Sequence, residues 1–190
     1  MSCKLIPYSL AAVFVFGAAA LVHADDYGLD PTHTAVSFQV SHLGISWTHG
    51  RFNQVEGQFS IDPANPADAM FAMAINADSI DTGNQQRDDH LRSPDYFNTK
   101  QFPTISFKST KAEKVEEGIQ VTGDMTMHGQ TKAITFLLKG GKTATFPQGV
   151  ERMGFSTSLK IKRSDFGMSN MLEAIGDEIF IGISFEGVKK

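Results

Sequence analysis

The sequence predicts an all-β protein: an eight-stranded antiparallel β-barrel with a short helix in the long segment between two strands. Three observations lead to this prediction. Apolar and polar residues alternate along eight segments, as expected for strands that bury one face. Turn-forming residues separate most of these segments, as in antiparallel sheets. Eight strands can also close into a barrel that side chains fill, or that holds one slender ligand.

The eight predicted strands begin at Ala35. In the first, Val36, Phe38 and Val40 alternate with polar residues, and Ile181 and Phe185 lie on the apolar face of the last. A two-sheet sandwich of the same strands is the alternative architecture. The predicted ranges are 35–41, 50–61, 69–76, 104–111, 119–127, 132–139, 154–162 and 178–188.

Glycines inside or between these strands give two local predictions. Gly57 lies within an alternating segment, which indicates a bulge or a close approach of another backbone. Gly140-Gly141 follows another such segment, and a glycine pair at this position predicts a hairpin.

Two segments lack alternation. The first, 77–103, contains a predicted short helix at 85–92, which Ser93-Pro94 would end. A segment of this length between strands is uncommon unless it has a role, such as covering an opening. The second irregular segment is 163–177.

Residues 1–24 have the layout of a cleavable signal peptide. Lys4 precedes an apolar run from Leu10 to Val22, and Ala24 provides a small residue at the cleavage site. A retained membrane anchor is the alternative, but it needs about 20 apolar residues. The predicted domains are therefore a leader, 1–24, and one barrel domain, 25–190.

The composition indicates which cellular compartment the protein occupies and argues against one class of partner. The only cysteine, Cys3, lies in the leader, so the mature chain would contain no disulfide. An exported domain of this size without disulfides fits the periplasm of a Gram-negative bacterium. The net charge of −4 and the absence of a basic stripe argue against a nucleic-acid partner.

No catalytic or metal motif is evident. The sequence contains neither a GxSxG elbow nor a phosphate-binding loop, and its histidines lack the spacing of metal-ligand pairs. Asp177 and Glu178 are adjacent on a predicted strand, so they would point to opposite faces. We therefore predict no catalytic residues, no metal and no cofactor.

Arg87 and His90 are the candidate head-group ligands. Being three residues apart on the predicted helix, they share one face and could bind an anionic group there. The alternative is a solvated helix with internal ion pairs, which spacing alone favours.

The apolar stripes would face the barrel interior. Strand periodicity alone does not decide whether that interior is a filled core or an open bore. The residues predicted to line it are Phe38, Val40, Phe107, Met125, Phe136, Phe155, Leu159, Ile181 and Phe185.

Four stretches together resemble the YceI family of periplasmic, lipocalin-like proteins associated with polyisoprenoid binding. They occur in the order and spacing of that family and span almost the whole mature chain. Tyr96, Met125 and Met127 are conservative departures from its usual residues. The four stretches are YGLDPTHTAVSF (27–38) with its continuation to Ile45, IDTGN (80–84) with its continuation to Phe107, GDMTMHGQTK (123–132), and RSDFGM (163–168) with IGDE (175–178).

The resemblance implies an apolar bore that encloses a long amphiphile: a polyprenyl chain, a quinone-like molecule, or a fatty amide or acid. It implies a binding or carrier protein with no catalytic residues and no stable membrane insertion, and it leaves a homodimer open. Two alternatives remain. One is an enzyme acting on an enclosed lipid or quinone, favoured if His33, His42, His90 or Asp165 cluster at one mouth. The other is a ligand-free stress or interaction protein.

Overall fold

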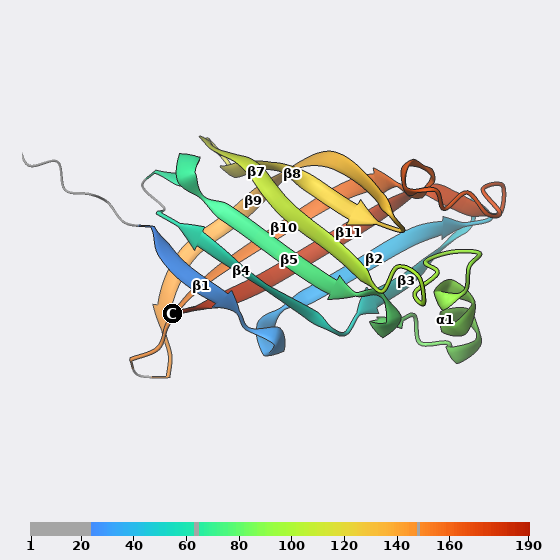
Figure 1. The fold of residues 1–190 in the computed structure, drawn as a ribbon, viewed down its shortest axis with the longest axis horizontal. Coiled ribbons are helices and arrows are strands. Elements are labelled where there is room, and N and C mark those ends of the chain that lie inside the picture. Colours follow the sequence, from blue (N-terminus) through green and yellow to red (C-terminus); the bar gives the residue numbers. More distant parts are fainter. Residues whose placement is uncertain (1–23, 63–64, 148) are drawn as a thin grey trace, which may run out of the picture.

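The computed structural model describes residues 24–62, 65–147 and 149–190. The predicted leader therefore lies, except for Ala24, outside the described residues. No helix in these ranges is long and apolar enough to cross a membrane. The described chain forms one antiparallel sheet that curls until its first and last strands pair (Figure 1).

Some strand segments of this sheet are successive parts of one interrupted strand. A single α-helix, α1 (Gln85–Arg92), is found in the described ranges, as predicted. The strand segments found there are β1 (Asp25–Leu29), β2 (Ala35–His42), β3 (Ser46–Phe52), β4 (Val55–Ile61), β5 (Met70–Asn76), β6 (Ile80–Asp81), β7 (Thr104–Val115), β8 (Gly118–Met127), β9 (Gln130–Thr145), β10 (Glu151–Lys162) and β11 (Ile175–Lys189).

The barrel closes along β11. One edge of β11 pairs first with β2 and then, further along the strand, with β1. Tyr27 of β1 lies opposite Lys189, and Val36 of β2 lies opposite Ile183. β1 and β2 therefore act as one interrupted strand, and β4 and β3 pair with them in the same order. With these pairs counted as single strands, and with β6, which follows β5 and pairs with β3, counted together with β5, the barrel has eight strands, so the predicted fold is confirmed.

The segment β1 is not among the predicted strands, several predicted strands extend a few residues further than expected, and two predictions differ more clearly. The strand predicted at 50–61 begins earlier, at Ser46, and is interrupted after Phe52. The hairpin predicted at Gly140-Gly141 is wrong, because β9 runs through both glycines and the chain reverses only after Thr145. Both glycines have positive φ, and the register shifts opposite them, between Gly154 and Phe155, so they form a bulge.

Gly57 allows two strands to approach closely. A Cβ atom at this position would lie 2.3 Å from the carbonyl oxygen of Ala72 on β5. The β4–β5 ladder passes Gly57 without a shift in register, so close approach, and not a bulge, explains this glycine.

The seam between β9 and β10 is paired along only part of its length. Its ladder runs from Thr145 opposite Glu151 to Lys139 opposite Ser156. Beyond that point, residues 130–138 of β9 and 157–162 of β10 have no ladder partners in each other, although both stretches are described. A hollow of about 450 Å³ lies at the open part of the seam, and buried Phe166 contributes to its wall.

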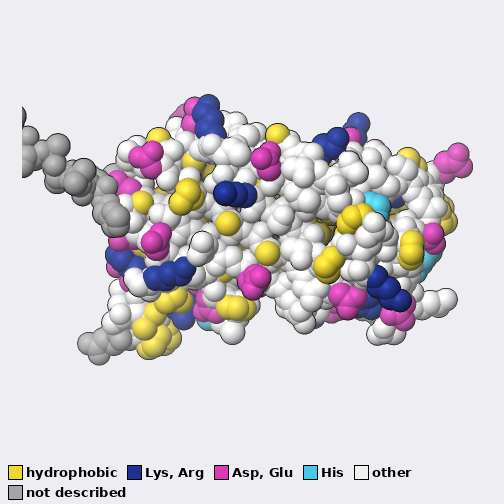
Figure 2. All heavy atoms as spheres, in the orientation of Figure 1, with side chains coloured by type: hydrophobic (Ala, Val, Ile, Leu, Met, Phe, Trp, Pro, Cys, Tyr) yellow, Lys and Arg dark blue, Asp and Glu magenta, His cyan; other side chains and the backbone are white. Residues whose placement is uncertain are grey.

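Alternation directs large side chains inward. On the face shown in Figure 2, hydrophobic side chains occur as separate spots among charged ones. The buried hydrophobic residues form two clusters, one towards each end of the barrel interior. The space between and beside these clusters determines what the barrel can hold.

Candidate functional site

The barrel encloses a cavity of about 690 Å³ with predominantly apolar walls. This volume is within the usual range for small-molecule sites, about 300–1,000 Å³. Eight of the nine side chains predicted to line the bore do line it. The exception is Phe155, which is buried in the cluster at the closed end. The eight are Phe38, Val40, Phe107, Met125, Phe136, Leu159, Ile181 and Phe185.

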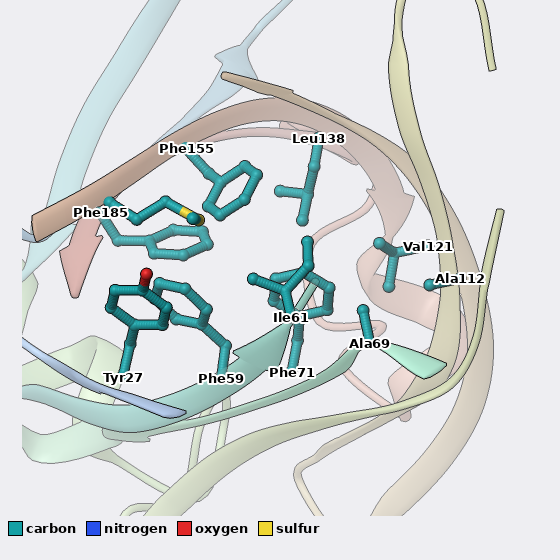
Figure 3. Close-up of a cluster of buried hydrophobic side chains, with 11 residues drawn as sticks. Tyr27, Phe59, Ile61, Ala69, Phe71, Ala112, Val121, Leu138, Phe155 and Phe185 are labelled. Atoms are coloured by element: carbon teal, nitrogen blue, oxygen red, sulfur yellow. The ribbon is translucent and has the colours of Figure 1, made fainter. Parts of the chain in front are cut away.

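An aromatic cluster fills the closed end of the barrel (Figure 3). Phe59 is at its centre: its ring stacks on Tyr27 at 4.8 Å and meets the edge of Phe155 at 5.6 Å. The Tyr27 hydroxyl donates a hydrogen bond to Glu151 at 2.9 Å, and burial, the main cause, raises the pKa of Tyr27 to about 12. Since Phe59 and Phe185 also line the cavity, this cluster forms its floor.

The opposite end is open, and α1 lies beside it (Figure 1). Asn84 caps the helix by accepting a hydrogen bond from the backbone N–H of Arg87 at 3.0 Å. Asp88, the buried residue of the helix, accepts hydrogen bonds from the backbone and the hydroxyl of Thr82. These contacts fix α1 at the mouth, consistent with the predicted role of the long irregular segment as a cover.

Arg87 and His90 both line the mouth, and both already have protein partners. Arg87 donates to the hydroxyl of Thr82 at 2.7 Å and to its carbonyl at 2.9 Å. His90 lies 3.0 Å from a carboxylate oxygen of Asp95, and its ring meets Tyr96 edge-on at 5.0 Å. The internal partner of Arg87 is thus a threonine. Whether either residue binds a head group stays a prediction.

Arg163, which sequence reasoning did not select, also lines the cavity and is only 4% exposed. Its guanidinium donates to the carbonyls of Gly176, Met168 and Ile175 at 2.8–3.0 Å. A guanidinium has five N–H donors, so two remain. Within the described ranges, no carboxylate lies within 4 Å of it.

The electrostatics of Arg163 follow from this setting. Burial is the main cause that lowers its pKa, while Tyr96 and Asp177 act in the opposite direction. Burial likewise raises the pKa of Tyr96, whose hydroxyl has no hydrogen bond within the described chain. The mouth therefore presents a buried cation without an ion pair beside a phenol with an unused hydrogen bond. An acidic or strongly accepting group would complement both.

Strand periodicity could have identified Arg163. The inward series Phe155, Thr157, Leu159 and Ile161 continues by two residues to position 163. Nothing in the spacing, however, indicates the three carbonyl partners that a loop supplies.

Thr157 is the polar exception on the apolar wall. It is 7% exposed and lines the cavity. Among the described residues, its hydroxyl is the buried side-chain group without a hydrogen-bond partner. Its neighbours on the inward face are Phe155, in the closed-end cluster, and Leu159, which packs at the open end.

The candidate catalytic residues do not gather at one mouth. His42 and His90 line the cavity, whereas His33 pairs with Asp30 at 2.9 Å and is not part of the wall. Asp165 lies at the β9–β10 hollow. The described ranges contain no group of three His, Cys, Asp or Glu residues arranged to hold a metal ion.

Comparison with known proteins gives one consistent result. A family model described as YceI-like domain matches residues 27–187. The chain is 38% identical to Protein YceI of Escherichia coli O157:H7 over 181 residues, which covers 94% of each chain. It is 36% identical to a UPF0312 protein of Pseudomonas aeruginosa over 182 residues, with 95% of this chain and 94% of that one covered.

Solved structures agree with the fold. A Campylobacter jejuni YCEI protein superposes with a TM-score of 0.71 at 35% identity, covering 79% of this chain and 90% of that one. A polyisoprenoid binding domain from Saccharophagus degradans has a TM-score of 0.66 at 17% identity, covering 86% and 98%. At that identity, the second likeness supports the barrel alone.

Proposed function

The chain belongs to the YceI-like domain family, and on this premise we propose that it binds one long-chain amphiphile inside its barrel. The ligand would be an isoprenoid or a similar lipid, such as a polyprenyl phosphate, a quinone-like molecule, or a fatty amide or acid. The protein would carry or sequester this lipid in the bacterial periplasm. The role is one of binding, without catalysis.

The cavity is the observation that carries this proposal. Its walls are apolar, its floor is the aromatic cluster, and its polar side chains gather mainly at the mouth. Burial of about 400 Å² of ligand surface at about 25 cal/mol per Å² corresponds to roughly 10 kcal/mol before the costs of association. A prenyl chain would suit such a wall, and one structural neighbour is described as a polyisoprenoid binding domain.

The head group would lie between Arg163 and Tyr96, with Arg87 and His90 at the rim. This arrangement would neutralise the buried guanidinium and use the free phenol hydrogen bond. It favours an acidic or strongly accepting head over an apolar one, because apolar walls by themselves select little between chains of equal length.

Native purification followed by lipid extraction and mass spectrometry tests the proposal. We expect one lipid per barrel in wild type and less bound lipid in Ile181→Trp, because the larger side chain narrows the cavity from its wall. Phe180→Trp is the matched control, because Phe180 packs outside the cavity against Trp47 and Lys160. A wild-type protein that neither retains nor takes up any amphiphile would contradict the proposal.

Tyr96→Phe tests the head-group position. It removes one hydroxyl and keeps the ring. We expect weaker binding of an acidic-head lipid by about 1 kcal/mol, the usual net value of a hydrogen bond, and unchanged binding of the neutral lipid of equal chain length. Equal losses for both lipids would place the head elsewhere.

A further inference from the structure

The largest apolar side chains left exposed include a group beside the cavity mouth. Leu43, Ile45 and Trp47 belong to the β2–β3 turn and the start of β3, and Met171 and Leu172 belong to the loop before β11. Their exposed fractions range from 41% to 83%. We call these five residues the rim patch.

The two halves of the rim patch are held together. The backbone N–H of Leu43 donates to the carbonyl of Ala174 at 2.7 Å. Leu43 and Met171 both adopt a positive φ, of 54° and 52°, which is unusual for large side chains and has an energetic cost. The fold therefore accepts local strain at both tips of an exposed apolar surface.

The rim patch is continuous with the cavity. Met171 is both an exposed member of the patch and a cavity-lining residue, and His42 and Ile175 line the cavity next to its two halves. The tip segments 43–48 and 167–172 contain no Asp, Glu, Lys or Arg. Moving them into an apolar medium would therefore not desolvate a charged side chain of their own.

We propose that the rim patch docks the barrel, mouth first, onto the surface of a lipid bilayer. The proposal rests on the proposed function, since an amphiphile that enters the cavity otherwise has to cross water. Exposing an apolar chain to water is unfavourable, in proportion to the apolar surface exposed. Docking would let the chain pass between bilayer and barrel without this cost. Trp47 suits the position, because tryptophan is enriched at membrane interfaces.

A second copy of the chain fits the patch less well. A stable protein interface buries about 800 Å² on each partner and uses about 20–30 residues a side. The rim patch, with five residues on two tips, is far smaller than such an interface. A shallow insertion of a few apolar side chains into a bilayer needs no such area.

Trp47 provides the measurement, because it is the only tryptophan in the chain. With vesicles of phosphatidylcholine and phosphatidylethanolamine, we expect a blue shift of its emission, quenching by lipids with brominated chains, and co-sedimentation of the protein. The double variant Leu43→Asn/Ile45→Ser should bind vesicles at least about tenfold more weakly, because two apolar contacts are removed. Asn tolerates the positive φ at position 43.

Met70→Ser is the matched control. Met70 is 63% exposed and lies at the other end of the barrel, where β5 begins beside the end of β4. Its loss should leave vesicle binding unchanged. Equal weakening in both variants, or no change in Trp47 emission with wild type, would overturn the proposal. A dimer seen by sedimentation and lost only in the rim variant would also overturn it and assign the patch to a second copy.

A separate measurement distinguishes this proposal from the proposed function. Uptake of a fluorescent fatty acid from dilute solution requires the cavity and no bilayer. The rim variant should take it up as wild type does, because Leu43 and Ile45 do not line the cavity. Failure of uptake in wild type would refute the lipid-binding function, whereas normal uptake without vesicle binding would refute docking alone.

Discussion

At the residue scale, Arg87 has two possible roles that one substitution separates. Its guanidinium is held by Thr82 and faces the cavity mouth. We expect Arg87→Ala to weaken binding of an acidic-head lipid by about 1.5–3 kcal/mol, the range for a charge-assisted hydrogen bond, and to leave binding of a neutral lipid nearly unchanged. Parallel titrations of both lipids measure this. If the residue only holds the mouth loop, both lipids bind more weakly and the melting temperature falls.

Thr157 predicts a gain in stability on substitution. Its buried hydroxyl has no partner within the described chain, and leaving a polar group unpaired costs about 1–3 kcal/mol. Thr157→Val keeps the volume and removes the hydroxyl, so it should raise the free energy of unfolding of the lipid-free protein by that amount. Chemical denaturation measures the change, and Ser158→Ala, on an exposed neighbour, is the control. An unchanged stability would indicate that water satisfies the hydroxyl.

Asp30 makes the stability of the folded protein depend on pH in the acidic range. Hydrogen bonds from Thr32, Arg152 and His33 hold the pKa of its carboxyl well below its usual range. A lowered folded pKa stabilises the fold above the unfolded value of about 3.9, and this contribution is lost as the pH falls from there towards the folded pKa. Asp30→Asn should therefore lose stability near neutral pH and show a shallower decline in acid. Unfolding curves between about pH 2.5 and 7 measure this. A decline as steep as in wild type would assign it to other carboxyls, such as Asp81 and Asp177, whose pKa values are also lowered.

At the scale of elements, the seam between β9 and β10 predicts uneven protection. Residues 130–138 of β9 pair with β8 alone and residues 139–145 pair with β10 alone, whereas β8 pairs with β7 on one side and β9 on the other. About half of the amides in 130–138 should therefore exchange hydrogen rapidly, because alternate residues point their N–H groups towards the open side. NMR of hydrogen exchange measures this, with β8 as the internal control. Uniform protection along β9 would mean that the seam closes in solution.

Strand and helix positions followed from the sequence where one rule dominated. Period-2 alternation located the eight strands, and the Ser93-Pro94 stop located the end of α1. The rule failed where tertiary pairing decided the outcome. The segment β1 is only five residues long and depends on β4 and β11 for partners. The bulge at Gly140-Gly141 resembles a hairpin in sequence, because both features use glycine with positive φ.

The residues of the candidate binding site could be predicted from the sequence to a similar extent. Alternation identified the cavity wall, because one face of every strand has to point inward. The mouth was harder to predict. Thr82 as the partner of Arg87, and the carbonyls that hold Arg163, depend on how two irregular segments fold over the same opening. No periodicity describes such segments.

At the scale of the whole molecule, removal of the lipid predicts a loss of stability. A ligand at 100 times its dissociation constant stabilises a protein by about 2.7 kcal/mol. Protein stripped of lipid by organic extraction and refolded should melt at a lower temperature than the native preparation and recover when lipid is added. Treatment of the native preparation with a chelator should change nothing. A fall with the chelator and none on delipidation would instead favour a metal-dependent protein.

The pairing of β1 with β11 also determines when the barrel can close during folding. These are the first and the last strands of the ring in chain order, and Tyr27, which belongs to the floor cluster, lies opposite Lys189. During synthesis, β1 emerges first and has to wait for β11 before its second edge is covered. Contacts this distant in sequence form late and slowly. The barrel therefore cannot close before β11 has been synthesised, and the growing chain stays open until then.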